Sequence, residues 1–107
     1  MPRIMVVDDD TAVLKLITMM LEQEGYEVTG YSDAALALES DLGDVEAIVT
    51  DLDMPLPGEA FIQQVRRESD IPIIAVSGNV SAERAQFLRN IGAQNVLSKP
   101  LSLPVFL

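Results

Sequence analysis

Five short apolar segments, separated by stretches of helical periodicity, constrain the fold of this chain more than any other feature of its sequence. They span residues 3 to 7, 26 to 31, 46 to 50, 71 to 77 and 95 to 98. Their length and their β-branched or aromatic residues are typical of strands. Strands that alternate with helices form right-handed β-α-β units, whose parallel sheet is covered by helices on both faces. The sequence therefore predicts an α/β domain.

The longest of the predicted helices runs from residue 11 to residue 24. We expect Asp10 or Thr11 to cap its beginning and Gly25 to end it. Its apolar stripe, which should face the core, consists of Val13, Leu16, Ile17, Met20 and Leu21. Met19 and Met20 are accordingly interpreted as packing residues rather than as part of a metal or cofactor site.

Three shorter helices are predicted at residues 33 to 42, 59 to 68 and 81 to 90, the last with Ser81 as its cap. Arg66 and Arg67 are interpreted as part of a solvated helix face, with no assigned role. After Pro100 the chain is too short for a full fifth helix and contains Pro104. We therefore expect that helix to be truncated or absent.

Composition excludes several classes of function. The 107 residues suit one domain, and 7 basic against 17 acidic residues give a net charge of −10, which opposes binding to nucleic acid or to anionic membranes. The chain has no cysteine and no histidine, so thiolate chemistry and the commonest general base are excluded. No segment resembles a signal peptide or a membrane span. We expect a cytoplasmic protein.

Polar side chains follow the predicted strands at their carboxyl ends. Asp8 and Asp9 follow the first strand, Asp51 the third, Ser77 ends the fourth and Lys99 follows the fifth. In an open parallel sheet these ends form the ligand crevice. Carboxylates gathered there repel one another unless a cation lies among them, and a set of oxygen ligands suits Mg²⁺.

A phosphoryl group would explain the hydroxyl and the ammonium group at the same edge. Both are suitable donors to phosphoryl oxygens, and one carboxylate can act as the nucleophile that forms an aspartyl phosphate. Each residue taken alone also has a purely structural explanation. Asp8 to Asp10 could cap a helix, and Asp51 with Asp53 could form a turn before Pro55. For Asp10 we retain the capping role.

Four motifs stand in order, each after a predicted strand: VVDDD (6–10), TDLDMP (50–55), VSG (76–78) and SKP (98–100). With these motifs the chain resembles the receiver domain of bacterial two-component response regulators of the chemotaxis type. The resemblance implies a single receiver domain over residues 1 to 107. Its fold would be a flavodoxin-like three-layer sandwich with a five-stranded parallel sheet in the order 2-1-3-4-5.

The resemblance also implies the residues of a magnesium site. Asp51 corresponds to the phosphoacceptor and is itself a ligand of the ion. Asp9 corresponds to a direct Mg²⁺ ligand and Asp8 to one that acts through water, while Asp53 contributes its backbone carbonyl. Mn²⁺ is expected to substitute for Mg²⁺.

The remaining family positions concern switching. Ser77 corresponds to the hydroxyl that moves toward the phosphoryl group, Lys99 to the lysine that pairs with it, and Pro100 to the proline whose peptide bond with Lys99 is cis. Val96 stands where the family usually has an aromatic residue that rotates on activation, so the hydroxyl half of the switch is present without its aromatic partner.

The function implied by the resemblance is that of a signalling switch. A histidine kinase or a histidine phosphotransfer protein would donate the phosphoryl group. The domain would catalyse its own phosphorylation and autodephosphorylation without being a conventional enzyme. A homodimer or an attached output domain is possible, whereas no membrane or nucleic-acid partner is expected for this domain.

Two alternatives remain open. Haloacid-dehalogenase-type Mg²⁺ phosphatases also use an Asp-x-Asp nucleophile, which Asp51 and Asp53 would match. In those enzymes, however, the acidic pair comes last in the chain, whereas Asp8 and Asp9 come first here. A receiver-like interaction module that is never phosphorylated is the other alternative.

Overall fold

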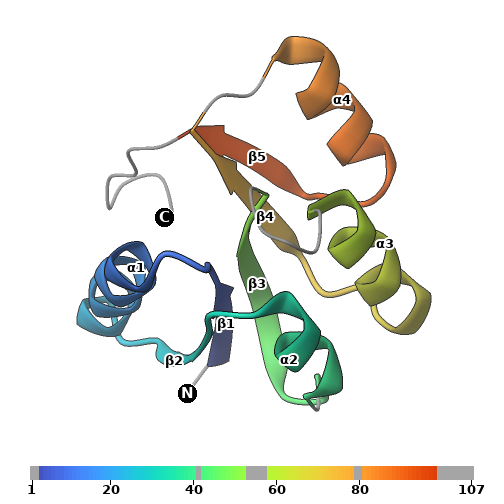
Figure 1. Ribbon diagram of the computed structural model, residues 1–107. Helices are drawn as coiled ribbons and strands as arrows, with labels where there is room; N and C mark the ends of the chain where they lie inside the picture. The colour runs from blue at the N-terminus through green and yellow to red at the C-terminus, as the bar shows by residue number, and fades with distance from the viewer. Residues whose placement is uncertain (1–2, 41, 53–57, 79–80, 99–107) are drawn as a thin grey trace.

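The strands form one parallel sheet. The computed structural model describes residues 3–40, 42–52, 58–78 and 81–98. The sheet order is β2-β1-β3-β4-β5, as predicted, which is the flavodoxin-like order (Figure 1). Its strands are β1 (Arg3–Val7), β2 (Glu27–Tyr31), β3 (Val45–Asp51), β4 (Ile73–Ser77) and β5 (Asn95–Ser98).

Helices cover both faces of this sheet. They are α1 (Thr11–Gln23), α2 (Ala34–Glu39), α3 (Gly58–Glu68) and α4 (Ala82–Asn90). α1 packs on one face, and α2, α3 and α4 contribute to the core on the other (Figure 1). Asp10 and Ser81 cap α1 and α4 as predicted, because their side chains accept hydrogen bonds from backbone N–H groups of the first turn. The region predicted to lack a full fifth helix, residues 101 to 107, lies outside the described residues.

α2 is shorter than predicted. It ends at Glu39 rather than at residue 42, and Ser40 has an extended backbone conformation. The Ser40 hydroxyl donates a hydrogen bond of 2.6 Å to the carbonyl of Ala37, which competes with continuation of the helix. None of the described helices combines the length and the apolar character needed to cross a membrane.

Leu16 departs from the predicted apolar stripe of α1, whereas Val13 packs against the core as expected. Ile17 and Leu21 are buried as expected, but Leu16 is 55% and Met19 is 49% exposed, so neither is a core residue. Leu14 packs against the sheet instead. It does so over Gly30, where a Cβ atom would lie 3.2 Å from the Leu14 Cδ1 atom.

Arg66 is not part of a solvated face, which corrects the sequence interpretation. Its guanidinium group donates to the carbonyl of Gly92 at 2.6 and 3.0 Å, to that of Ile71 at 2.7 Å and to that of Ser69 at 3.2 Å. Gly92 has a φ of +126°, and a Cβ atom there would lie 2.6 Å from the Arg66 Cγ atom. Arg66 therefore ties the end of α3 to the loops before β4 and β5.

Replacing Arg66 with alanine is expected to lower the free energy of unfolding by about 2–3 kcal/mol, because it removes charged hydrogen-bond donors from three carbonyl groups. Arg67 is exposed on the same helix, so Arg67→Ala should change the free energy of unfolding by less than about 0.5 kcal/mol. Urea denaturation of both variants measures the difference. Equal losses would contradict the role given to Arg66.

Candidate functional site

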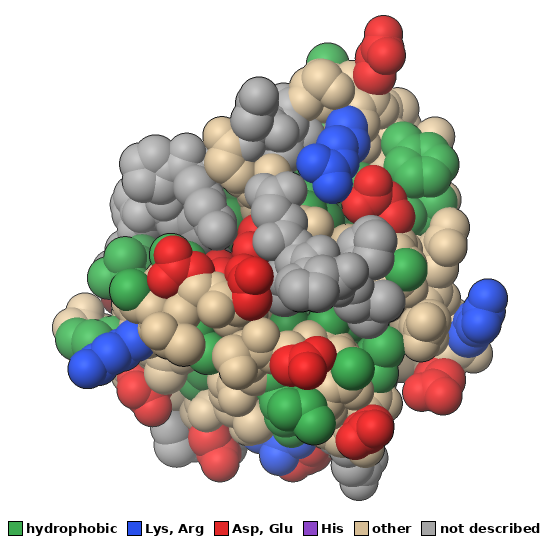
Figure 2. All heavy atoms as spheres, viewed as in Figure 1, with side chains coloured by type: hydrophobic (Ala, Val, Ile, Leu, Met, Phe, Trp, Pro, Cys, Tyr) green, Lys and Arg blue, Asp and Glu red, His purple; other side chains and the backbone are tan. Residues whose placement is uncertain are grey.

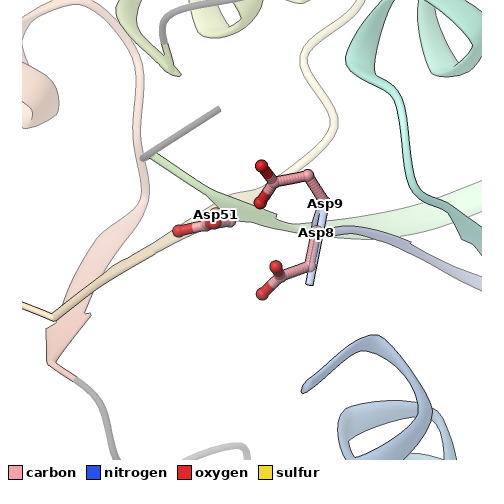
Figure 3. Close-up of side chains that lie close together, drawn as sticks. All are labelled: Asp8, Asp9 and Asp51. Atoms are coloured by element: carbon pink, nitrogen blue, oxygen red, sulfur yellow. The ribbon is translucent and has the colours of Figure 1, made fainter. Parts of the chain in front are cut away.

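Three carboxylates meet at the carboxyl edge of the sheet. Asp8 and Asp9 follow β1, and Asp51 ends the neighbouring β3, where Val7 pairs with Thr50. One carboxylate oxygen from each residue lies within 4.8 Å of the others. The three labelled side chains lie together at the same end of these neighbouring strands (Figure 3). Adjacent parallel strands thus bring together acids that are more than 40 residues apart in the chain.

Local hydrogen bonds fix the position of Asp8. Its N–H donates to the carbonyl of Tyr31 at 3.0 Å, which extends the pairing of β1 with β2 by one residue. Its Oδ1 accepts from the N–H of Asp10 at 2.9 Å. Asp10 in turn caps α1, so the beginning of that helix holds the Asp8 carboxylate in place.

The burial of the cluster is uneven. Asp8 is only 1% and Asp51 only 4% exposed, whereas Asp9 is exposed to solvent. Acidic side chains gather on this face of the molecule (Figure 2). Carboxylates that are this close and this buried repel one another, and a divalent cation relieves the repulsion. Oxygen ligands with one side open to water suit Mg²⁺, so Asp8, Asp9 and Asp51 fit a magnesium site chemically.

Ser77 lies at the same edge of the sheet. It ends β4 and is 1% exposed. β4 pairs with β3 so that Asp51 is the partner of Val76, and the N–H of Leu52 donates to the carbonyl of Val76 at 2.9 Å. The hydroxyl-bearing residue therefore follows directly after the strand position that pairs with Asp51.

The other residues named from the sequence divide into two groups. Val96 lies in β5, is partly buried and packs against the core cluster that includes Phe61 and Leu88. Asp53, Lys99 and Pro100 lie outside the described residues, so their roles stay predictions.

Two contacts near the site had no signal in the sequence. The N–H of Gly58 donates to the carbonyl of Leu52 at 3.3 Å, and a Cβ atom at Gly58 would lie 2.9 Å from the Leu52 Cα atom. The second contact is an ion pair of 3.2 Å between Glu59 and Arg84, which are 25 residues apart. No periodicity or motif links either pair, so the fold alone reveals them.

Comparison with known proteins identifies one family for this chain. The family model of the response regulator receiver domain matches residues 4–107. The nisin biosynthesis regulatory protein NisR of Lactococcus lactis subsp. lactis is 34% identical over 94% of this chain and 45% of its own length. The transcriptional regulatory protein PrrA of Mycobacterium tuberculosis is 35% identical over 95% of this chain and 45% of its own length.

The fold of this chain also matches that of a solved chemotaxis protein. The chemotaxis protein CheY4 of Vibrio cholerae superposes with a TM-score of 0.91 at 28% identity, over 99% of this chain and 92% of that one. This chain spans less than half the length of NisR and PrrA, as their coverage of 45% shows.

Proposed function

Because this chain belongs to the response regulator receiver domain family, we propose that Asp51 accepts a phosphoryl group from a histidine kinase or a histidine phosphotransfer protein. The observation that carries the proposal is the cluster of Asp8, Asp9 and Asp51, whose carboxylate oxygens lie within 4.8 Å of one another. A single carboxylate at a strand end would be a turn residue. Three carboxylates at adjacent strand ends form a site for a cation and a phosphoryl group.

The proposed reaction is an in-line displacement. An oxygen of the Asp51 carboxylate attacks phosphorus, the P–N bond of the phosphohistidine breaks, and the imidazole nitrogen keeps the electron pair. Asp8 and Asp9 would hold Mg²⁺ together with Asp51 and the Asp53 carbonyl. When bound, Mg²⁺ neutralises charge on the phosphoryl oxygens. The burial of Asp51, at 4% exposed, limits approach to the open side of the cluster.

Ser77 and Lys99 complete the proposed machinery. The Lys99 ammonium group would pair with a phosphoryl oxygen, and the Ser77 hydroxyl would donate to another. The chain is a receiver domain rather than a classical enzyme. We propose that it catalyses only its own phosphorylation and autodephosphorylation.

The context of the domain is also a proposal. The relatives NisR and PrrA are more than twice as long as the region they share with this chain, which supports an attached output domain. A homodimer is a further possible assembly. We place the domain in the cytoplasm, where nucleotide-dependent kinases would supply its phosphoryl donor. The net charge of −10 argues against nucleic acid as a direct partner of this domain.

Incubation with acetyl phosphate and Mg²⁺ is expected to add one phosphoryl group to the chain, because the acidic cluster supplies both the nucleophile and the cation site. Intact-mass spectrometry measures the adduct, and a parallel sample with EDTA is the control. The same protein should release negligible phosphate from generic phosphomonoesters. Rapid multiple turnover of such esters would favour the phosphatase alternative, and a Mg²⁺-independent adduct would contradict the site.

A further inference from the structure

The beginning of α3 is fastened to the strand end that carries Asp51. Leu52 is 2% exposed and hydrogen-bonds through its N–H to Val76 of β4, while its carbonyl accepts from the N–H of Gly58. Only a glycine fits at position 58, because a Cβ atom would lie 2.9 Å from the Leu52 Cα atom. Leu52 therefore lies in direct contact with the first residue of α3.

The next residue of α3 reaches α4. Glu59 Oε1 lies 3.2 Å from Arg84 Nη2, and both side chains are 32% exposed. Arg84 belongs to the first turn of α4, where its N–H also donates to the Ser81 cap at 3.1 Å. The ion pair thus joins the first turns of two helices that follow the two sides of the candidate site, α3 after Asp51 and α4 after Ser77.

Side chains of α3 reach both ends of α4. Beyond its C-terminal end, the Gly92 carbonyl accepts two hydrogen bonds from Arg66, at 2.6 and 3.0 Å. At its N-terminal end α3 contacts it through the partly exposed Glu59–Arg84 ion pair, and pairs of this exposure change an equilibrium constant by up to about fivefold.

We propose that the Glu59–Arg84 ion pair couples occupancy of the acidic site to the position of the N-terminal end of α4. The inference rests on the proposed function, because the occupied state is the phosphorylated one. The ion pair would transmit the change without a rotating aromatic residue. Val96 cannot take the place of such a residue, because its β-branched side chain has a single stiff torsion. Coupling of this kind is reciprocal, so loss of the pair should also change the affinity of the site.

Amide chemical shifts of ¹⁵N-labelled protein test the coupling, with Mg²⁺ and beryllofluoride as the phosphoryl mimic. In the unmodified chain, saturation should shift the resonances of residues 82–90 as well as those near Asp8 and Asp51. In Glu59→Ala the shifts of residues 82–90 should fall by at least half, while those near the site persist. Glu68→Ala removes the same charge from an exposed position of the same helix and should leave both sets unchanged.

A charge exchange separates the ion pair from a general loss of structure. Arg84→Glu alone should reduce the response of α4, and Arg84→Glu combined with Glu59→Arg should restore it. The dissociation constant for beryllofluoride should change by up to about fivefold in Glu59→Ala. A full response of α4 in Glu59→Ala, or a failure of the charge exchange to restore it, would overturn the coupling.

The two proposals fail in different ways. If beryllofluoride shifts no resonance near Asp51 in the unmodified chain, the proposed function fails and the coupling with it. If the site responds but residues 82–90 respond equally in the unmodified chain and in Glu59→Ala, only the coupling fails.

Discussion

Replacing Asp51 with asparagine is expected to abolish the phosphoryl adduct. The amide oxygen is a far weaker nucleophile than a carboxylate oxygen, and the substitution also removes one of the three charges that would hold Mg²⁺. Asparagine has nearly the same volume, so the packing around this buried position, 4% exposed, should persist. Intact-mass spectrometry after treatment with acetyl phosphate and Mg²⁺ measures the loss.

Asp53→Asn is the matched control for this experiment. It makes the same chemical change two residues away, at a position proposed to contribute only its backbone carbonyl, so the adduct should still form. An adduct that survives Asp51→Asn, or one that is lost only in Asp53→Asn, would show that the nucleophile has been misassigned. Circular dichroism of both variants establishes that they are folded.

The sheet could be predicted from the sequence because its signal is local and repeated. Each strand is a short apolar run, and its alternation with helical segments predicts a parallel sheet, whereas the order of the five strands was expected from the resemblance to receiver domains. Helix boundaries and helix faces depend on contacts that a local sequence pattern does not display. α2 ends where the Ser40 hydroxyl donates a hydrogen bond to the carbonyl of Ala37 in the last turn of the helix. Leu14 rather than Leu16 faces the sheet, because Gly30 leaves space for its side chain.

The candidate site was predictable because the carboxyl ends of parallel strands meet at one edge of the sheet. Asp8, Asp9 and Asp51 meet because β1 and β3 are neighbours, which follows from the strand order. Long side chains that bridge helices follow no such rule. The pairs Arg66–Gly92 and Glu59–Arg84 span 26 and 25 residues, and in the sequence those arginines look like ordinary surface residues.

Replacing Asp9 with asparagine is expected to raise the stability of the metal-free protein while weakening its response to Mg²⁺. The Asp9 carboxylate lies within 4.8 Å of two buried carboxylates, so neutralising it removes repulsion worth on the order of 1 kcal/mol. The loss of a negative charge near the first turn of α1 opposes this gain by roughly 0.3–1 kcal/mol, but that interaction is screened at an exposed position. The repulsion should therefore dominate.

Thermal denaturation with and without Mg²⁺ measures both effects. At a Mg²⁺ concentration ten times the dissociation constant, binding should stabilise the unmodified chain by about 1.4 kcal/mol, and most of this increment should disappear in Asp9→Asn. Asp70→Asn makes the same chemical change at an exposed position that is not part of the acidic cluster, and should alter neither quantity. If Asp9→Asn instead lowers the stability in EDTA and keeps the full Mg²⁺ increment, the three carboxylates do not form one electrostatic site.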